Sequence, residues 1–286
     1  MTDDTFPHDP ARFTPQMAMQ NFAGNAGITL AEMGIAPLVV LSWSRKLLAD
    51  FAGRIGAPTA LHWPYGERNP LYSGVLNGKP VSFLQAPVGA PGTVMMMEEL
   101  IACGAHTILG LGWAGSLQPH APVGSFLLPT RCIREEGTSF HYDPDPAAEI
   151  VPDAALLEKL LQAAQAEGVQ PIIGPHWTTD APYRETLAKL ADYRQQGILG
   201  VDMETSAMYV LGRYRGVRVA NLSDVQCLFA VETLTARPVG VAVYNRADLE
   251  HVTVLHLGMS EDYCTGGMND DVGLLLRLMG EVRRSA

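Results

Sequence analysis

Two acidic segments in the C-terminal half of the sequence have the residue types and spacing for polyol and proton-transfer chemistry. Asp202-Met203-Glu204 ends one apolar run, and after a helical pattern Ser223-Asp224 ends a second one. Strand ends joined by a crossover helix lie side by side in an α/β sheet, so these acids are expected to converge on one ligand. A carboxylate at Glu204 can accept hydrogen bonds from two vicinal hydroxyls, and a desolvated carboxyl at Asp224 can donate a proton. The spacing predicts a polyol site beside a proton-transfer site.

Each of these acids also has a simpler interpretation. Asp202 or Glu204 can stabilise the N-terminus of the following helix by its negative charge, and Asp202 can also serve a structural bond. Asp224 can act as a capping residue. Met203 offers an apolar contact to one face of a sugar ring.

A glycine-rich segment, Gly110 to Gly115, follows another apolar run. Main-chain N–H groups in such a segment can approach a ligand closely, and this makes Ala114 and Gly115 candidate binding residues. The spacing does not match a dinucleotide-binding fingerprint, because prolines and another apolar run follow where a helix would be needed. A tight turn between two strands is the alternative interpretation. Arg45 and Arg68 are candidate anion ligands, although isolated arginines are usually surface charges.

The elements that position these residues alternate along the chain. Short apolar runs rich in Val, Ile and Leu are typical of buried strands and lie at residues 38–41, 81–88, 107–111, 125–129, 171–174, 198–203 and 217–222. Helical patterns lie between them, at residues 44–55, 93–103, 152–167, 183–196 and 205–214. This order predicts a single α/β domain with a mixed central sheet flanked by helices.

The domain is expected to span residues 28–286, preceded by an N-terminal arm at residues 1–27. The arm is polar and aperiodic, which predicts a segment that lies on the body or on a neighbouring subunit. A last helix is expected at about 270–283. Strand-like pieces at 239–244 and 252–257 and a glycine-rich turn at 264–267 have no evident place in the sheet.

Composition excludes several classes of protein. A net charge of −10 and a pI near 5.2 disfavour a nucleic-acid polymer as partner, because such binders normally present a basic face. No apolar run is long enough to cross a membrane and the N-terminus lacks a signal-peptide pattern, so a cytoplasmic protein is expected. The four cysteines are widely spaced and the histidines form no HExxH pair, so no metal site is predicted. His8, His62, His141 and His176 each remain individual candidates for a site.

Several segments resemble the nucleoside phosphorylase family, which contains hexameric-type purine nucleoside phosphorylase, uridine phosphorylase and the methylthioadenosine nucleosidases. The resemblance runs in the order of the family from about residue 81 to 224, roughly half of the chain. The segments that carry it are residues 98–104, 112–124, 134–142, 179–183 and 197–224. It implies a mixed sheet wrapped by helices, a small-molecule nucleoside as partner, and a homo-oligomer, either a dimer or a hexamer.

The resemblance also implies roles for individual residues. Glu204 would bind the ribose hydroxyls, Met203 would pack on the sugar, and Asp224 would protonate a purine base at N7. Tyr183 matches an aromatic position near the base, although the preceding residue, usually Phe, is Pro182 here.

The segments that would bind phosphate depart from the family. Gly110 and Trp113 stand where phosphorylases of the family carry an Arg and a Ser or Thr. Arg45 matches a phosphate-binding arginine, and Arg68 is an approximate match to an arginine supplied by a neighbouring subunit. The glutamate that activates water in the hydrolytic members is missing near the first strand. Neither reaction therefore has the full set of family residues.

The expected function is cleavage of the N-glycosidic bond of a nucleoside, with a purine-like base favoured and inorganic phosphate as co-substrate; no other cofactor is expected. A phosphate-independent nucleosidase is the close alternative. A nucleoside-binding protein with a decayed anion site is a further alternative, with Trp113 filling the phosphate space. The last alternative is an enzyme for a modified nucleoside, with Trp43 and Trp113 stacking on an extra group.

Overall fold

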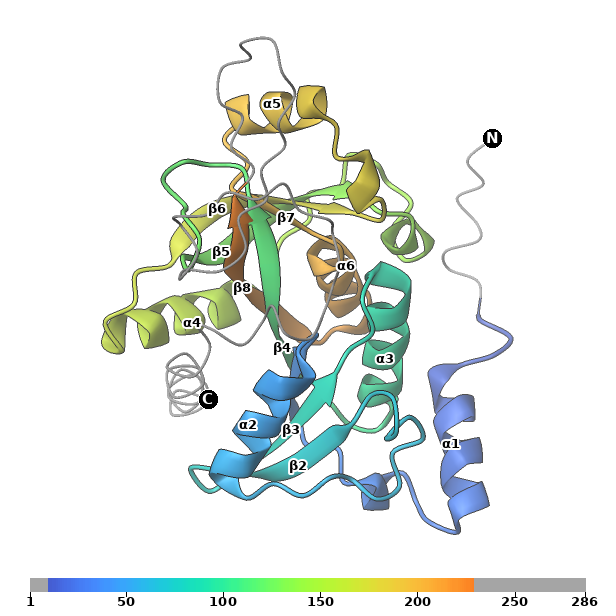
Figure 1. Ribbon diagram of the computed structural model, residues 1–286. Helices are drawn as coiled ribbons and strands as arrows, with labels where there is room; N and C mark the ends of the chain where they lie inside the picture. The colour runs from blue at the N-terminus through green and yellow to red at the C-terminus, as the bar shows by residue number, and fades with distance from the viewer. Residues whose placement is uncertain (1–9, 229–286) are drawn as a thin grey trace.

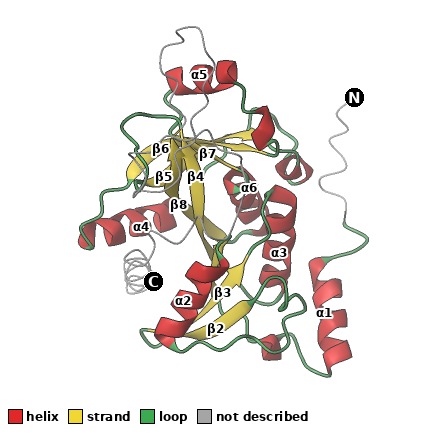
Figure 2. Cartoon of the chain, viewed as in Figure 1, coloured by secondary structure: helices red, strands yellow, loops and turns green. Residues whose placement is uncertain are grey.

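In the computed structural model, which describes residues 10–228, one eight-stranded mixed sheet is covered by helices on both faces (Figures 1 and 2). The strands are β1 (Leu38–Ser42), β2 (Leu71–Leu76), β3 (Lys79–Gln85), β4 (Thr107–Ser116), β5 (Phe126–Glu135), β6 (Ile172–Thr179), β7 (Gly200–Asp202) and β8 (Arg218–Leu228). The predicted α/β fold with a mixed sheet is confirmed.

Strand β4 organises the sheet, whose order is β2-β3-β1-β4-β7-β6-β5-β8 with an additional pairing of β4 to β8. Along one edge β4 pairs with β1 at residues 107–111 and then with β7 at residues 115–116. Along its other edge β4 pairs with β8 over its whole length. The strands β4, β7, β6, β5 and β8 thus close into a ring, and β1, β3 and β2 extend from it. The expectation that the strands ending at Asp202 and Asp224 are neighbours is wrong, because β4 lies between them.

The helices are α1 (Pro15–Ala26), α2 (Arg45–Ile55), α3 (Ala90–Ala102), α4 (Ala154–Ala166), α5 (Leu187–Gln195) and α6 (Thr205–Arg215), with short 3₁₀ turns at Ala31–Met33, Thr138–His141 and Pro182–Arg184. Their ends follow local chemistry. The Ser44 hydroxyl accepts a hydrogen bond from the main-chain N–H of Leu47 and starts α2, and Gly56 ends that helix in the left-handed conformation.

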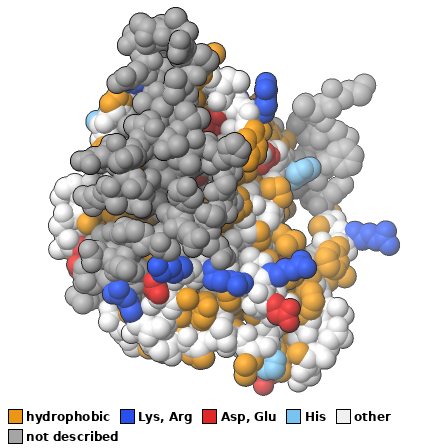
Figure 3. Space-filling view, in the orientation of Figure 1, with side chains coloured by type: hydrophobic (Ala, Val, Ile, Leu, Met, Phe, Trp, Pro, Cys, Tyr) orange, Lys and Arg blue, Asp and Glu red, His pale blue; other side chains and the backbone are white. Residues whose placement is uncertain are grey.

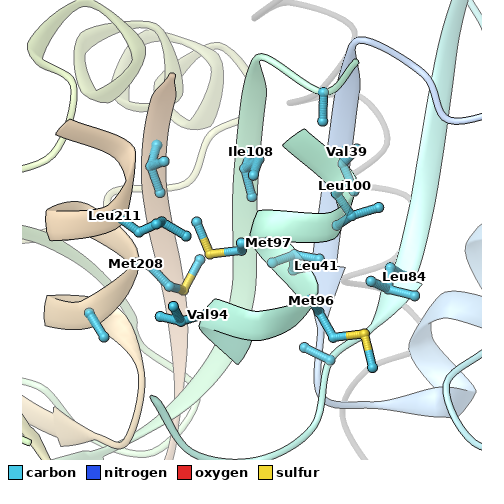
Figure 4. Close-up of a cluster of buried hydrophobic side chains, with 14 of the residues drawn as sticks. Val39, Leu41, Leu84, Val94, Met96, Met97, Leu100, Ile108, Met208 and Leu211 are labelled. Carbon is cyan, nitrogen blue, oxygen red and sulfur yellow. The ribbon is translucent and has the colours of Figure 1, made fainter. Parts of the chain in front are cut away.

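Two apolar layers hold the helices on the sheet. Helices α1, α3 and α6 cover one face, and α2 and α4 cover the other (Figure 1). On the first face Met96 and Met97 of α3 and Met208 of α6 pack over Val39 of β1 and Ile108 of β4 (Figure 4). This layer fixes α3 and α6 against each other, and both helices begin next to the predicted sugar-binding residues.

The N-terminal arm differs from its prediction. Residues 15–26 form a helix, which begins after a Thr14 side-chain cap, and it packs against α3 with Met19 and Ala23 buried. Only these two positions face the core, so the amphipathic pattern is too weak to be seen in the sequence. Within the described residues the arm lies on the body.

All seven predicted strands and all five helical patterns that lie within residues 10–228 correspond to observed elements, while β2 was not predicted. The glycine-rich segment Gly110 to Gly115 is not a turn or loop; it lies inside β4, with a register shift between Ala114 and Gly115. The predicted helix at 270–283, the strand-like pieces at 239–244 and 252–257 and the turn at 264–267 lie outside the described residues.

The face of the molecule shown in Figure 3 is not uniformly basic. In Figure 3 the Lys and Arg side chains lie mostly in one band at the level of α2, interspersed with acidic, apolar and uncharged groups. No helix among residues 10–228 has the length and apolar character to cross a membrane.

Candidate functional site

The corner between β7 and α6 carries three of the predicted site residues, Asp202, Met203 and Glu204. Asp202 is the last residue of β7, and α6 begins at Thr205. One carboxylate oxygen of Asp202, Oδ1, accepts hydrogen bonds from the main-chain N–H groups of Glu204 and Thr205, both at 3.2 Å. Asp202 therefore caps the N-terminus of α6 and fixes the main chain on which Glu204 is carried.

Further polar groups surround the carboxylate of Asp202. The hydroxyl of Thr178 donates to Oδ1 at 2.9 Å, the hydroxyl of Thr205 donates to Oδ2, and Nε2 of His176 lies 3.1 Å from Oδ2. Burial acts to raise the pKa of Asp202, but the interaction with His176 and the hydrogen bonds from the two threonines outweigh it, so this pKa lies below its usual value. Asp202 is thus held as a buried anion.

Glu204 is buried as well, with 7% of its surface exposed. Its Oε1 accepts a hydrogen bond from the main-chain N–H of Gly89 at 2.6 Å, and its Oε2 accepts one from the N–H of Met203 at 3.2 Å. Burial, followed by the nearby charge of Asp202, raises the pKa of Glu204 to about 8, although both N–H groups act to lower it. Because a carboxylate has about four acceptor positions, Glu204 retains acceptors for two more donors such as vicinal hydroxyls.

The segment from β3 to α3 connects this corner to the first strand. At its start the Oε1 atom of Gln85 accepts a hydrogen bond from Nε of Arg45 at 3.2 Å, and at its end Gly89 binds Glu204. Between them the carbonyl of Pro87 accepts a hydrogen bond from Nε1 of Trp43 at 3.0 Å. Four residue steps span at most about 14 Å, so the segment links the predicted anion and sugar residues over a short distance.

The two predicted anion ligands are brought to the same region. Nη2 of Arg45 donates to the main-chain carbonyls of Glu67 and Arg68, at 3.0 and 3.1 Å. The side chains of both arginines are exposed. The guanidinium of Arg45 is therefore held by neutral acceptors and lies beside the main chain of Arg68.

The glycines of β4 accommodate large side chains from other segments. A Cβ atom on Gly112 would lie 2.8 Å from Cζ3 of Trp43, and one on Gly110 would lie 2.3 Å from Oδ1 of Asn221. Trp43 is 8% exposed and its N–H also lies 3.2 Å from the hydroxyl oxygen of Thr93. Its ring packs on Gly112 and is buried. The alternative in which Trp43 stacks on an extra group of a modified nucleoside requires an accessible ring, and the structure does not provide one at Trp43.

The residues predicted to lie near the base have no hydrogen bond to the corner at Asp202 and Glu204 among the contacts described above. Asp224 is half-buried within β8, in register with Trp113 of β4 and Phe126 of β5, and the strand continues to Leu228 instead of ending at Asp224. Tyr183 lies in the 3₁₀ turn Pro182–Arg184 and is 77% exposed. Ala114 and Gly115 are buried at the register shift of β4, next to Val201 of β7.

A cavity of about 930 Å³ lies elsewhere, between α1, the exposed side of α3 and the end of α6. Its lining includes Glu98, which forms a two-pronged ion pair with Arg215, and Tyr142 and Tyr214. None of the predicted sugar, base or anion residues lines this cavity.

Sequence reasoning missed one partner of the corner, Gly89, and did not single out another, His176. Gly89, which binds Glu204, comes from a segment more than a hundred positions away, and no local motif marks it. His176 was only one of four candidate histidines. The signal that distinguishes it is its place in an apolar strand, since a buried histidine needs a polar partner.

Comparison with known proteins gives one consistent answer. The sequence profile of the phosphorylase superfamily matches residues 37–226, more than half of the chain. Uridine phosphorylase of Haemophilus influenzae is 28% identical over 168 residues, covering 53% of this chain and 66% of that protein. Uridine phosphorylase of Treponema pallidum is 35% identical over 160 residues, and guanosine phosphorylase of Halorubrum lacusprofundi is 30% identical over 149 residues. These two alignments cover 51% and 52% of this chain, respectively, and 61% of each relative.

A crystal structure of uridine phosphorylase from Vibrio fischeri superposes with a TM-score of 0.63 and 26% identity, covering 68% of this chain and 80% of that one. The chain spans about three fifths to two thirds of the length of the curated relatives it matches.

Proposed function

Because the chain belongs to the phosphorylase superfamily, we propose that it cleaves the N-glycosidic bond of a nucleoside by phosphorolysis, releasing the base and a sugar 1-phosphate. The match of the superfamily profile to residues 37–226 confirms the family resemblance seen in the sequence. The observation that carries the proposal is the buried carboxylate of Glu204, fixed between the N–H groups of Gly89 and Met203 with acceptor capacity to spare. Such an arrangement suits the 2′- and 3′-hydroxyls of a ribose.

In the proposed phosphorolysis each predicted site residue has a role. Phosphate oxygen attacks C1′ while the bond from C1′ to the base nitrogen breaks, so positive charge develops on the sugar. Glu204 holds the hydroxyls, Met203 packs on the sugar face, and the charge is stabilised by the buried carboxylates. Asp224 donates a proton to the departing base, which would otherwise leave as an anion. Tyr183, Trp113, Ala114 and Gly115 form the surroundings of base and sugar in this proposal.

Arg45 and Arg68 supply the positive charge for phosphate, which is the only co-substrate proposed. Their side chains are exposed and come from adjacent segments, so both can turn toward an anion without unfolding any element. In a homo-oligomer Arg68 would serve the site of a neighbouring subunit, as the resemblance implies. Sedimentation of the purified protein tests this assembly, and a monomer at all concentrations would contradict a role for Arg68 in trans.

Hydrolysis is the second candidate, and three features of the anion side favour it. Trp43 packs on Gly112, and Gly110 and Trp113 occupy positions where the family's phosphorylases carry phosphate ligands. Arg45 is already bonded to neutral acceptors. These features weaken the anion site while leaving the sugar corner intact, so water remains a competing nucleophile.

The base is proposed to be a purine on the strength of Asp224, which resembles the acid of the purine members. The relatives named above include uridine phosphorylases as well as a guanosine phosphorylase, so uridine is the necessary comparison substrate.

The deciding experiment incubates the protein with guanosine, inosine, uridine and a 5′-modified adenosine, each with and without inorganic phosphate, and separates the products by chromatography. Phosphorolysis predicts free base and sugar 1-phosphate only when phosphate is present. Free ribose without phosphate would establish the hydrolase instead. Tight calorimetric binding without turnover would establish a nucleoside-binding protein.

The role of Asp224 has its own test. Asp224→Asn preserves size but cannot donate the acid proton, so the rate on a purine nucleoside should fall by about 10²-fold or more. An unchanged rate would remove Asp224 from the mechanism while leaving the sugar site in place.

A further inference from the structure

A buried histidine lies directly behind the corner that carries Glu204. His176 is 0% exposed and sits on β6, opposite Gly200 of β7. Neither of its ring nitrogens has an aligned hydrogen-bond partner among the described residues, and Nε2 lies 3.1 Å from Oδ2 of Asp202. An unpaired polar ring in the core is costly, so its presence calls for a role.

The structure makes room for this ring at a specific place. A Cβ atom on Gly200 would lie 3.1 Å from Cε1 of His176 and 2.9 Å from the carbonyl oxygen of Gly115. Only glycine therefore permits the imidazole and β4 to approach β7 this closely. The ring is packed against the short strand that ends at Asp202.

The carboxylate of Asp202 connects the ring to Glu204. Its Oδ2 faces His176, and its Oδ1 accepts the main-chain N–H groups of Glu204 and Thr205. The two oxygens belong to one rigid planar group. A shift or rotation on the His176 side is therefore transmitted to the main chain that carries the Glu204 side chain.

We propose that His176 and Asp202 form a positioning pair that aims the Glu204 carboxylate at the ribose hydroxyls, and that this pair sets the preference for ribonucleosides over 2′-deoxyribonucleosides. The proposal rests on the proposed nucleoside-cleaving function. His176 touches neither sugar nor base in this scheme and acts through Asp202. Its contact with Oδ2 tightens into an aligned hydrogen bond when the substrate hydroxyls engage Glu204, as polar contacts in unliganded sites commonly do.

The sharpest test compares two substitutions at position 176. Glutamine retains an N–H donor at about the reach of Nε2, whereas leucine has similar bulk but no donor. His106→Leu is the matched control, because His106 is exposed and precedes β4 at the end far from Gly115. For each variant kcat/KM is measured on guanosine and 2′-deoxyguanosine and on uridine and 2′-deoxyuridine.

We expect His176→Leu to lower kcat/KM about tenfold more on the ribonucleoside, which loses both hydroxyl contacts, than on the 2′-deoxyribonucleoside, which loses only the contact of its 3′-hydroxyl, so the ribose preference falls about tenfold. His176→Gln should retain most of the preference, and His106→Leu should retain all of it. Thermal denaturation of each variant shows that the comparison is made on folded protein. Should the leucine variant not fold, His176→Asn replaces it, because the shorter amide does not reach Asp202.

An equal loss on both sugars would overturn the positioning role and leave His176 as a packing residue. Failure of glutamine to retain the ribose preference on folded protein would also overturn it. If the unaltered protein neither cleaves nor binds any of the four nucleosides, the proposed function itself fails and the positioning role fails with it. That outcome differs from the first two, in which the unaltered protein remains active.

Discussion

The sugar corner and the anion side of the proposed site are built in opposite ways. At the corner, Asp202 and Glu204 are buried and each carboxylate is held by at least two donors from separate residues. On the anion side, the side chains of Arg45 and Arg68 are exposed, and the first is bonded to neutral carbonyl and amide oxygens. The corner is preorganised for its ligand, whereas the anion side must rearrange, and preorganisation is what limits the cost of binding. Under the proposed function, we therefore expect the sugar to be recognised more strictly than the nucleophile.

Removing the carboxylate of Glu204 at the corner should have the largest effect on activity. Above pH 8, where Glu204 is ionised, Glu204→Gln should lower kcat/KM on a ribonucleoside about 10³-fold, because two charge-assisted hydrogen bonds are lost. Steady-state kinetics with the cleaved nucleoside measures this. A loss of less than tenfold would mean that the sugar is held elsewhere.

The substitution Glu204→Gln, which should lower activity, is expected to raise stability. The pKa of Glu204 is raised from 4.5 to about 8, so the folded protein holds a proton that the unfolded chain releases, and stability falls as pH rises between these values. Glu204→Gln should therefore melt higher than the unaltered protein at pH 8, by about 3 °C or more, and by less at pH 5. Activity that depends on the carboxylate should rise as pH approaches 8.

Removing the carboxylate of Asp202 should lower the free energy of unfolding. Asp202→Ala leaves two buried hydroxyls and two main-chain N–H groups without their acceptor and removes the carboxylate beside His176, so unfolding free energy should drop by about 4 kcal/mol in urea titrations. Because the pKa of Asp202 is lowered, its contribution is present above the unfolded value of 3.8 and is lost as pH falls further. The difference between the two proteins should shrink in acid, and a constant difference would contradict the charged role.

A smaller effect is expected where the two regions meet, at Gly112. Gly112→Ala places a methyl group 2.8 Å from the ring of Trp43, which should cost about 2 kcal/mol of unfolding free energy. Gly53→Ala is the control, because it lies inside α2 with no atom within 4 Å of the added carbon and should stabilise by about 0.5–1 kcal/mol. Equal effects of the two substitutions would show that Trp43 yields easily.

A substitution on the anion side, at Arg45, should have the smallest effect. Arg45→Ala should raise the KM for phosphate about fivefold while leaving the KM for the nucleoside unchanged, because an exposed charge contributes only about 1 kcal/mol. The measurement varies phosphate at saturating nucleoside. A loss as large as that of Glu204→Gln would mean that the anion side is as rigidly built as the corner.

Much of the fold could be predicted because buried strands are read from local composition. The apolar runs at β1, β4 and β8 and the helices between strands carry their own pattern. Strand β2, in contrast, was missed because its side chains are mostly half-exposed and Gly74 interrupts it. That glycine is required by contact with Ala57, whose Cβ would lie 2.7 Å from an added carbon, and such a contact is invisible in the local sequence.

One segment of the candidate site could be identified from local sequence for the same reason. Asp202, Met203 and Glu204 are adjacent, so one sequence segment identifies them and the structure places them at one corner. The positions of Asp224 relative to that corner and of the glycines in β4 depend on strand order and on distant side chains. Trp43 and Asn221 occupy the space that the missing Cβ atoms leave, which explains why a glycine-rich segment that reads as a loop is a strand here.

The placement of Trp43 gives the protein a spectroscopic reporter of its own. Its indole N–H is bonded to the carbonyl of Pro87, two residues before the N–H that holds Glu204. Indole emission shifts with the local electric field, so ionisation of Glu204 or arrival of a ligand at either end of this segment changes the fluorescence of Trp43. Of the four tryptophans in the chain, Trp63 and Trp177 are anchored to Asn69 and Glu135, and Trp113 pairs in register with Asp224. The part of a ligand-induced emission change that disappears in Trp43→Phe is the signal of Trp43, from which nucleoside and anion affinities can be titrated without any added label.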